Sequence, residues 1–329
     1  MKKKFALLAA LSVLLLFCDL LFGSARLPLR IVWDTLAGNN ADVIYQEIIF
    51  NHRLPKAITA ILAGSALSVA GVLMQTLFRN PLAGPDVLGV TSGASLGVAL
   101  LTFCASSFPW LAASGWGQVS AAIIGALTVL LLIILASIRI PQTVSLLIVG
   151  MMFGNFAGAI VSILQNSSNP DTLKLFVTWT FGSLSAVDWH YLQFMLPLVL
   201  AGLMVAFILQ KPLNLLLLGD NYATGLGVSV FRMRIWTILA TALLAGTSTA
   251  FTGPIAFIGI TVPHIARGIF RTSDHKAIIP AAILCGTTLM LACDILSQLA
   301  VSQGTLPINA ITALFGSPVI IWIILKGYR

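Results

Sequence analysis

The amino-acid sequence predicts an all-α membrane protein, a polytopic bundle of about ten transmembrane helices. Three observations carry this prediction: 58% of the 329 residues are hydrophobic, only 9% are Asp, Glu, Lys or Arg, and the mean hydropathy is +1.01. A soluble domain has about 25% charged residues, so a soluble globule and a nucleic-acid-binding protein are both excluded. We expect the lipid bilayer to cover most of the surface.

Ten apolar stretches are long enough to form spanning helices. Only α-helices and closed β-barrels satisfy every backbone hydrogen bond in lipid, and barrel strands are about ten residues of alternating polarity. Long unbroken apolar runs therefore predict helices, all within a single transmembrane domain over residues 1–329. The expected helices are centred on Phe5–Gly23, Pro55–Leu77, Gly89–Ser106, Gly117–Ile138, Thr143–Leu164, Tyr191–Gln210, Ile235–Phe251, Pro254–Phe270, Ala277–Val301 and Pro307–Leu325.

The first stretch, Phe5–Gly23, follows a basic start and has two interpretations. A basic start, an apolar centre and small residues near Ala25 also suit a cleaved signal peptide. We favour a retained span, because at about 1.5 Å per residue this stretch is about 28 Å long, close to the roughly 30 Å of the hydrocarbon core.

The 18 basic residues indicate which side of the membrane each end faces. Ten spans place most of these residues on the side of the N-terminus, and cytoplasmic loops carry the excess of Lys and Arg. We therefore expect both termini in the cytoplasm. The cytoplasmic set is Lys2, Lys3, Lys4, Arg79, Arg139, Lys211, Arg232, Arg234, Arg267, Arg271, Lys276, Lys326 and Arg329. The opposite set is Arg26, Arg30, Arg53, Lys56 and Lys174.

The eighth stretch, Pro254–Phe270, is short, and Pro263 interrupts it. Proline removes a backbone donor and breaks the helical hydrogen-bond ladder, so we expect a short re-entrant helix or a kinked span. Irregular backbone at membrane depth is tolerated where protein or a water-filled cavity covers it. A cavity beside this segment and a plain kink packed among neighbouring helices are both open interpretations.

Small residues recur at intervals of three or four in three of the expected spans. Glycine on one helical face lets two backbones approach closely, which helix packing in lipid requires. These positions predict a tightly packed bundle and do not identify a substrate. They are Gly64, Ser68 and Gly71, then Gly89, Gly93 and Gly97, then Gly150, Gly154 and Gly158.

Asp294 is the only carboxylate deep in a long apolar stretch, since Asp19 can approach the end of its helix. An ionisable group inside the membrane is a functional candidate, and a proton relay is one interpretation. The other is a structural aspartate that is hydrogen-bonded to a neighbouring helix. A proton-coupled carrier would show several such groups, and this sequence does not.

The sequence has no pattern that indicates catalysis, a cofactor or a metal site. It lacks the GxxxxGK[ST] loop that cradles ATP phosphates, and Ser24–Leu54, the longest loop, is too short for a catalytic domain. The cysteines have no CxxC spacing and lie in or beside apolar runs. We therefore expect a protein that is not an enzyme. The cysteines are Cys18, Cys104, Cys285 and Cys293.

Two charged segments outside the apolar runs are candidates for partner binding. In Lys211–Arg234, Asp220 could cap a short helix that Gly225 or Gly227 ends, and this helix would be either a connector or a docking surface. At the head of the second span, Arg53 and Lys56 would lie on nearly one helical face. Such cations anchor at lipid headgroups or recognise carboxylates of a partner.

Four segments together resemble the FecCD family of permease subunits from ABC importers for iron-siderophores, haem and vitamin B12. The resemblance is specific and runs from about Arg53 to Arg329. The segments occur in the family's order: RLPKAITAILAGSALSVAGVLMQTLFRNPLAGPDVLGVTSGASLG, LLGDNYATGLGVSV, GPIAFIGITVPHIAR and LPINAITALFGSPVIIWIILK.

The resemblance implies the type II ABC importer permease fold and a set of partners. Two copies of the permease would form a homodimer on two copies of a separate ATP-binding subunit. A periplasmic or surface substrate-binding protein would deliver the substrate to a path at the dimer interface. The location implied is the cell inner (cytoplasmic) membrane.

The resemblance also implies roles for particular residues. The coupling loop, residues 218–230, would rest on the ATPase, and the docking cations would be Arg53 and Lys56. Lys56 lacks the planar fork of arginine, and a third docking arginine of the family falls at Gln298, so the docking pattern departs from the family's. The implied ATPase contacts are Asp220, Tyr222, Ala223, Leu226 and Gly227. The implied cytoplasmic gate residues are Asn80, Leu82, Thr143 and Val144.

The function expected from the sequence is the permease subunit of an ABC importer that moves a bulky iron chelate, haem or cobalamin inward. A separate ATPase subunit would supply the energy. The alternative is a proton-coupled secondary transporter that uses Asp294. The sequence alone does not distinguish between the candidate substrates.

Overall fold

The computed structural model describes residues 1–23, 27–39, 42–104, 114–140, 142–299 and 305–327, and every regular element in these ranges is helical. The elements are α1 (Lys2–Leu21), α2 (Leu29–Leu36), α3 (Val43–Gln46), η1 (Glu47–Arg53), α4 (Leu54–Leu77), η2 (Pro85–Leu88), α5 (Val90–Phe103), α7 (Gly115–Arg139), α8 (Thr143–Asn166), α9 (Pro170–Thr180), α10 (Trp189–Ile208), α11 (Gln210–Leu216), α12 (Asp220–Gly225), α13 (Val230–Thr252), α14 (Ile258–Phe270), α15 (His275–Leu299) and α16 (Ile308–Gly327).

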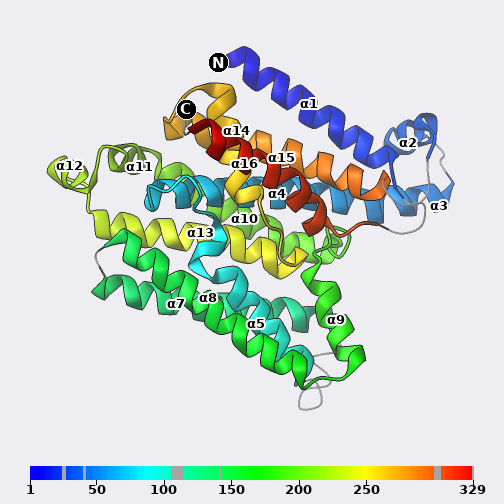
Figure 1. The fold of residues 1–329 in the computed structure, drawn as a ribbon. Coiled ribbons are helices and arrows are strands. Elements are labelled where there is room, and N and C mark those ends of the chain that lie inside the picture. The colour runs from blue at the N-terminus through cyan, green and yellow to red at the C-terminus, as the bar shows by residue number, and fades with distance from the viewer. Residues whose placement is uncertain (24–26, 40–41, 105–113, 141, 300–304, 328–329) are drawn as a thin grey trace.

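The predicted all-α membrane bundle is confirmed. Each of the ten expected stretches contains a helix, namely α1, α4, α5, α7, α8, α10, α13, α14, α15 and α16. In the described part of the chain, seven helices are long and apolar enough to cross a membrane, while α5, α14 and the apolar part of α16 are shorter. Helix α1 begins and α16 ends toward the end of the bundle that carries α11 and α12, and α2 and α3 lie at the other end (Figure 1). We call these the terminal end and the distal end.

Helix α4 is the centre of the bundle. It packs against α15, α13, α14 and α10, and it lies between α15 and α10 in Figure 1. In the stretch Val43–Leu77, which contains α4, 89% of the most apolar 18 residues are buried. The corresponding shares are 17% for α1 and 22% for α8. An apolar helix that is surrounded by other helices is buried on all sides, so the lipid-facing surface belongs to the peripheral helices.

The small residues predicted to allow close packing do so on α4 and α5. A Cβ atom at Gly64 would clash with the backbone of Gly286 on α15, and one at Gly71 would clash with Gly259 on α14. Gly93 and Gly97 of α5 meet the backbone of α7 in the same way. Gly158 differs, because no described atom lies within 4 Å of a Cβ placed there. Its side of α8 is open in the part of the chain that the structure describes.

The segment expected to be the longest loop is largely helical. It contains α2, α3 and the π-helix η1, and η1 runs directly into α4 at Leu54. Pro55 stands in the first turn of α4, where its missing N–H is not needed. The π-helix contributes an i→i+5 turn just before α4. It places Arg53 at the junction between the two helices.

The predicted interruption near Pro254 is present. Helix α13 ends at Thr252, Gly253 and Phe257 have left-handed φ angles of 74° and 69°, and the short helix α14 follows with Pro263 inside it. The irregular backbone finds partners on other elements. The Ser183 N–H donates to the Thr252 carbonyl at 2.7 Å, and the Ala256 N–H donates to Asn309 Oδ1 at 3.0 Å. These backbone groups at the break are thus hydrogen-bonded, as the membrane environment requires.

Candidate functional site

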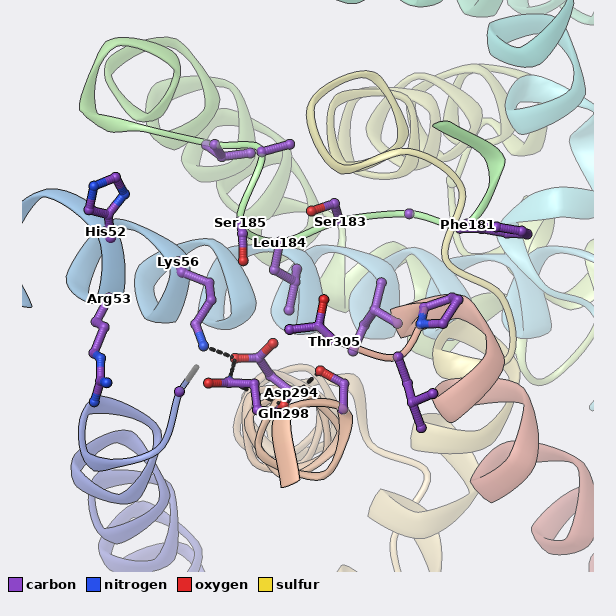
Figure 2. Close-up of a pocket in the computed structure, with 18 of the residues that line it drawn as sticks. His52, Arg53, Lys56, Phe181, Ser183, Leu184, Ser185, Asp294, Gln298 and Thr305 are labelled. Carbon is purple, nitrogen blue, oxygen red and sulfur yellow. Dashed lines mark hydrogen bonds and ion pairs between the residues drawn. The ribbon is translucent and has the colours of Figure 1, made fainter. Parts of the chain in front are cut away.

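A cavity of about 660 Å³ opens at the distal end, between the start of α4, the end of α15 and the segment that joins α9 to α10. Figure 2 shows Ser183, Leu184 and Ser185 on one side of it and Asp294 with Gln298 on the other. Its wall combines polar and apolar side chains. The lining residues are Gly23, Ile48, Asn51, His52, Arg53, Lys56, Thr178, residues 181–188, Asp294, Ser297, Gln298 and residues 305–308.

An ion pair between Lys56 and Asp294 forms part of the cavity wall. Lys56 Nζ lies 2.7 Å from Asp294 Oδ2, and both side chains are less than a tenth exposed. Figure 2 shows the lysine reaching from α4 to the aspartate on α15. Gln298, one turn further along α15, donates to Asp294 Oδ2 at 2.8 Å. The predicted intramembrane carboxylate therefore has a charged partner and an amide donor within the chain.

Asp19 completes this cluster, and its role was missed by the sequence analysis. It is fully buried on α1, and its Oδ1 lies 3.4 Å from Lys56 Nζ and 3.1 Å from Gln298 Nε2. A signal was available in the sequence. Two carboxylates and one lysine fall within apolar spans of a chain that has very few charges, and charges inside a bundle are found paired.

Arg53 is also engaged inside the chain. Its side chain is only 6% exposed, and one guanidinium nitrogen donates to the Leu20 carbonyl at 2.6 Å. Figure 2 shows Arg53 and Lys56 pointing the same way, toward the end of α1 and Asp294. The two cations thus share a face as expected, and both border the cavity at the distal end. Their charged groups make contacts within the chain.

A second cavity of about 700 Å³ lies between α7, α9, the start of α10 and the end of α13. It touches Thr252 and Gly253, so a cavity does accompany the interruption after α13. Thr178, Ser183 and Ala186 line both cavities. The end of α9 and the segment that follows it therefore form the wall between the two cavities.

At the terminal end, α11 precedes the coupling loop and α12 lies within it (Figure 1). Tyr222 and Leu226 are 64% and 57% exposed, whereas Ala223 is fully buried beneath them. Gly227 follows with a left-handed φ of 84°. Tyr222 and Leu226 therefore form a small surface that the described part of the chain leaves exposed.

The predicted cap at Asp220 is wrong in detail. Helix α12 begins at Asp220 itself, Gly219 is the N-cap with φ 113°, and no side chain caps the helix. Asp220 instead forms an ion pair with Arg79, which follows α4 and has a left-handed φ of 46°. Arg79 lies two residues beyond the end of α4, so its side chain is outside the helix and can reach Asp220. The ion pair connects the central helix to the coupling loop.

The predicted gate residues lie in two segments at the terminal end. Asn80 Oδ1 accepts a hydrogen bond from the Leu82 N–H at 2.9 Å, which closes a turn after α4. Thr143 and Val144 begin α8. Leu82 is 42% exposed and Val144 is 67% exposed. Both segments therefore offer apolar surface, and Thr143 is half-buried.

Asp274 fixes α11, the helix that precedes the coupling loop, to the bundle. Asn214 of α11 donates to Asp274 Oδ1 at 2.6 Å and accepts from the His275 N–H at 2.9 Å. The hydrogen bond from Asn214, together with one from the Lys276 amide, lowers the pKa of the Asp274 carboxyl below its ordinary value. Helix α11 is thus joined to the start of α15.

Comparison with known proteins shows relatives along nearly the whole chain. The hemin transport system permease protein HmuU of Yersinia pestis is 35% identical over 92% of this chain and 90% of that protein. The vitamin B12 import system permease protein BtuC of Klebsiella pneumoniae is 35% identical over 86% of this chain and 83% of that protein.

A solved structure shares the fold. A metal-chelate type ABC transporter in an inward-facing conformation superimposes with a TM-score of 0.87 at 29% sequence identity, covering 99% of this chain and all of that chain. This match confirms the type II importer permease fold that the sequence predicts. The FecCD transport family matches residues 10–326. On these matches, and on the bundle and its coupling loop, the chain belongs to the FecCD transport family.

Proposed function

We propose that this chain is the permease subunit of an ABC importer that carries a bulky iron chelate, haem or cobalamin across the inner membrane. The single observation that supports this most is the match, over 99% of the chain, to a metal-chelate type ABC transporter. The haem and vitamin B12 permeases among its relatives support haem and cobalamin as candidate substrates. ATP hydrolysis belongs to a separate subunit, and this chain is not itself an enzyme.

The proposed assembly is a homodimer on two ATP-binding subunits, with both termini in the cytoplasm. The terminal end then faces the ATPase, and the distal end faces a substrate-binding protein. In support, the exposed Tyr222 and Leu226 lie on the coupling loop at the terminal end. The 660 Å³ cavity opens at the other end, where a delivered substrate would enter.

Uptake by the complete assembly tests this function. The permease is reconstituted into vesicles with its ATPase and binding protein, and uptake of haem, cobalamin and ferric siderophores is compared. We expect uptake of one of these classes to stop when the ATPase subunit is catalytically inactive. Uptake that persists with the inactive ATPase would refute the proposal and support a carrier driven by an ion gradient. The proton-coupled alternative through Asp294 has no support among the relatives.

A pair of leucines tests the coupling surface. Leu226→Ala removes an exposed side chain of the coupling loop, whereas Leu29→Ala removes a similarly exposed leucine of α2 at the distal end. We expect only Leu226→Ala to weaken binding of the ATPase subunit and to lower substrate uptake. Equal effects of the two variants would show that Leu226 does not contact the ATPase subunit. Tyr222→Ala provides a second test of the same surface.

The docking proposal concerns Arg53 and Lys56 at the mouth of the cavity. Because both are engaged inside the chain, a carboxylate of the binding protein would have to compete with Asp294 and the Leu20 carbonyl for them. Reversing both charges (Arg53→Glu with Lys56→Glu) should weaken the affinity between the permease and the binding protein. It should also reduce the dependence of that affinity on salt concentration. Reversal of the exposed Lys174 on α9 is the control. A larger loss of affinity with Lys174→Glu than with the double variant would indicate that the binding protein docks on α9 instead.

A further inference from the structure

Three ionisable side chains from three helices meet in the buried cluster below the cavity. Asp19 comes from α1, Lys56 from α4 and Asp294 from α15, and their exposed fractions are 0%, 7% and 5%. The family match and the proposed transport of a chelate assign nothing to Asp19. The charge state of this cluster does not depend on the substrate.

The two carboxyl groups share the same donors. Lys56 Nζ lies 2.7 Å from Asp294 Oδ2 and 3.4 Å from Asp19 Oδ1. Gln298 Nε2 donates to the same two oxygen atoms at 2.8 Å and 3.1 Å. The side chains of Asp19 and Asp294 are also within hydrogen-bonding reach of each other. Two ionised carboxylates at that separation repel strongly where water is excluded.

One oxygen atom of this cluster lacks a donor. Asp19 Oδ2 is fully buried and has no hydrogen-bond partner in the described part of the chain. A buried carboxylate oxygen without a donor carries a large desolvation cost. Gln298 and Lys56 already contact the other oxygen atoms.

The remaining charged groups around the cluster do not separate the two carboxyl groups. Arg53 approaches from η1 and attracts Asp19, but its hydrogen bond of 2.6 Å goes to the Leu20 carbonyl. Cys293 is the neighbour of Asp294 on α15 and is a buried thiol. From α4, Lys56 is the charged group that contacts the cluster, and it faces both carboxyl groups at once.

We propose that Asp19 and Asp294 form a proton-binding site, in which the two carboxyl groups share a single proton taken from the solution. A hydrogen bond between two carboxyl groups requires one of them to be protonated, as in carboxyl pairs where like charges cannot both ionise. The site then contains one ammonium, one carboxylate and one carboxylic acid, and its own charges sum to zero. With the proton bound, one of the two carboxyl groups donates a hydrogen bond and the other accepts it.

The proton reaches this site through the cavity, because Lys56, Asp294 and Gln298 line it. The proton is retained and is not carried across the membrane, since no further carboxylate continues the path toward the terminal end in the described part of α15. Its role is to hold α1 against α15, two helices that contact each other along their length. Without the proton, the two like charges would push α1 outward.

Infrared spectroscopy of the purified permease in lipid tests the proposal. A protonated carboxylic acid has a carbonyl stretch that is separate from those of carboxylates and amides. We expect this band in the difference spectrum of the parent minus Asp19→Asn and in that of the parent minus Asp294→Asn. The reason is that either substitution leaves one carboxylate beside Lys56, which needs no proton. The matched control, Asp34→Asn, removes an exposed carboxylate that pairs with Arg30 on α2, and its difference spectrum should lack the band.

The outcomes separate the possible charge states. The absence of the band from both difference spectra would overturn the proposal. A band that is lost in only one of the two variants would assign the proton to a single carboxyl group and overturn the shared site. If an Asn variant does not fold, Asp19→Glu and Asp294→Glu retain the acid, and each should then shift the band; an unshifted band in both would refute the assignment.

Discussion

Gly71→Ala is expected to be one of the most damaging small substitutions in this chain. Gly71 lies at the contact between α4 and α14, where an added Cβ would meet the carbonyl group of Gly259, with its carbon atom at 2.6 Å and the Cα at 2.9 Å. Ordinary carbon contacts are about 3.5–4.0 Å. Backbone atoms cannot rotate away, and the Gly259 oxygen is nearer still, so α14 must move by at least about 1 Å to accept a single methyl group.

The expected magnitude follows from two opposing terms. Alanine in place of glycine inside a helix is favourable by about 0.5–1 kcal/mol, while overpacking a close contact costs about 1–3 kcal/mol. Because the obstacle at Gly71 is backbone, the upper part of that range applies, and the net loss is about 2 kcal/mol. At Gly158, where no described atom lies within 4 Å of an added Cβ, only the favourable term of about 0.5–1 kcal/mol applies.

The measurement is the free energy of unfolding from denaturant titration of the two variants and the parent in mixed micelles. We expect Gly71→Ala to be about 3 kcal/mol less stable than Gly158→Ala, which is the overpacking term alone, because both variants gain the same helix propensity. Equal stability of the two variants would refute the view that glycine at position 71 is needed for the close packing of α14 against α4. It would also show that the broken helix adjusts freely to its neighbour.

Three further predictions concern polar contacts. Lys56→Met should lower the free energy of unfolding by about 3–5 kcal/mol, because it leaves the buried carboxylate of Asp294 without its cation; denaturant titration measures this, and a loss under about 1 kcal/mol would contradict a buried pair and match an exposed one. Asn309→Ala should cost about 1–3 kcal/mol in the same titration, since the Ala256 N–H loses its acceptor beside the break after α13, and an unchanged stability would mean that water replaces the side chain. The pKa of Asp274 is lowered by the hydrogen bond from Asn214, so the carboxylate's contribution to stability is present above about pH 4 and is lost as the pH falls through the folded-state pKa. On acidification, the thermal midpoint of Asp274→Asn should therefore fall less than that of the parent. Parallel curves of midpoint against pH would contradict this.

The positions of the spanning helices could be predicted because apolar length alone determines them. Long runs such as Gly117–Ile138 and Thr143–Leu164 correspond closely to α7 and α8, since lipid leaves the backbone almost no alternative to a helix. The break near Pro254 was equally visible, because proline and glycine act through local backbone geometry. These features depend on residues that are close together in the sequence.

Features that depend on distant residues were not predicted. The helices α2 and η1 lie in a segment of mixed polarity, where tertiary contacts decide the conformation. The partner of Asp220 is Arg79, which is 141 positions away, and local rules could only propose that Asp220 caps its own helix. The burial of Arg53 and Lys56 likewise follows from the position of α1. No pattern within a single span records which helix lies beside it.

Helix α1 is attached to the bundle at three levels, and this has a consequence for how the chain is assembled during synthesis. Lys4 donates to the Ile269 carbonyl, Ser12 is hydrogen-bonded to Thr288, and Asp19 meets Lys56 and Asp294. All these partners except Lys56 are translated more than 200 residues later. Since the N-terminal part of a chain is made first, the α4 lysine is the earliest available partner for the buried carboxyl of α1. The ribosome must deliver α15 before the rest of the attachment can form, so the first helix to enter the membrane is among the last to be fixed in place.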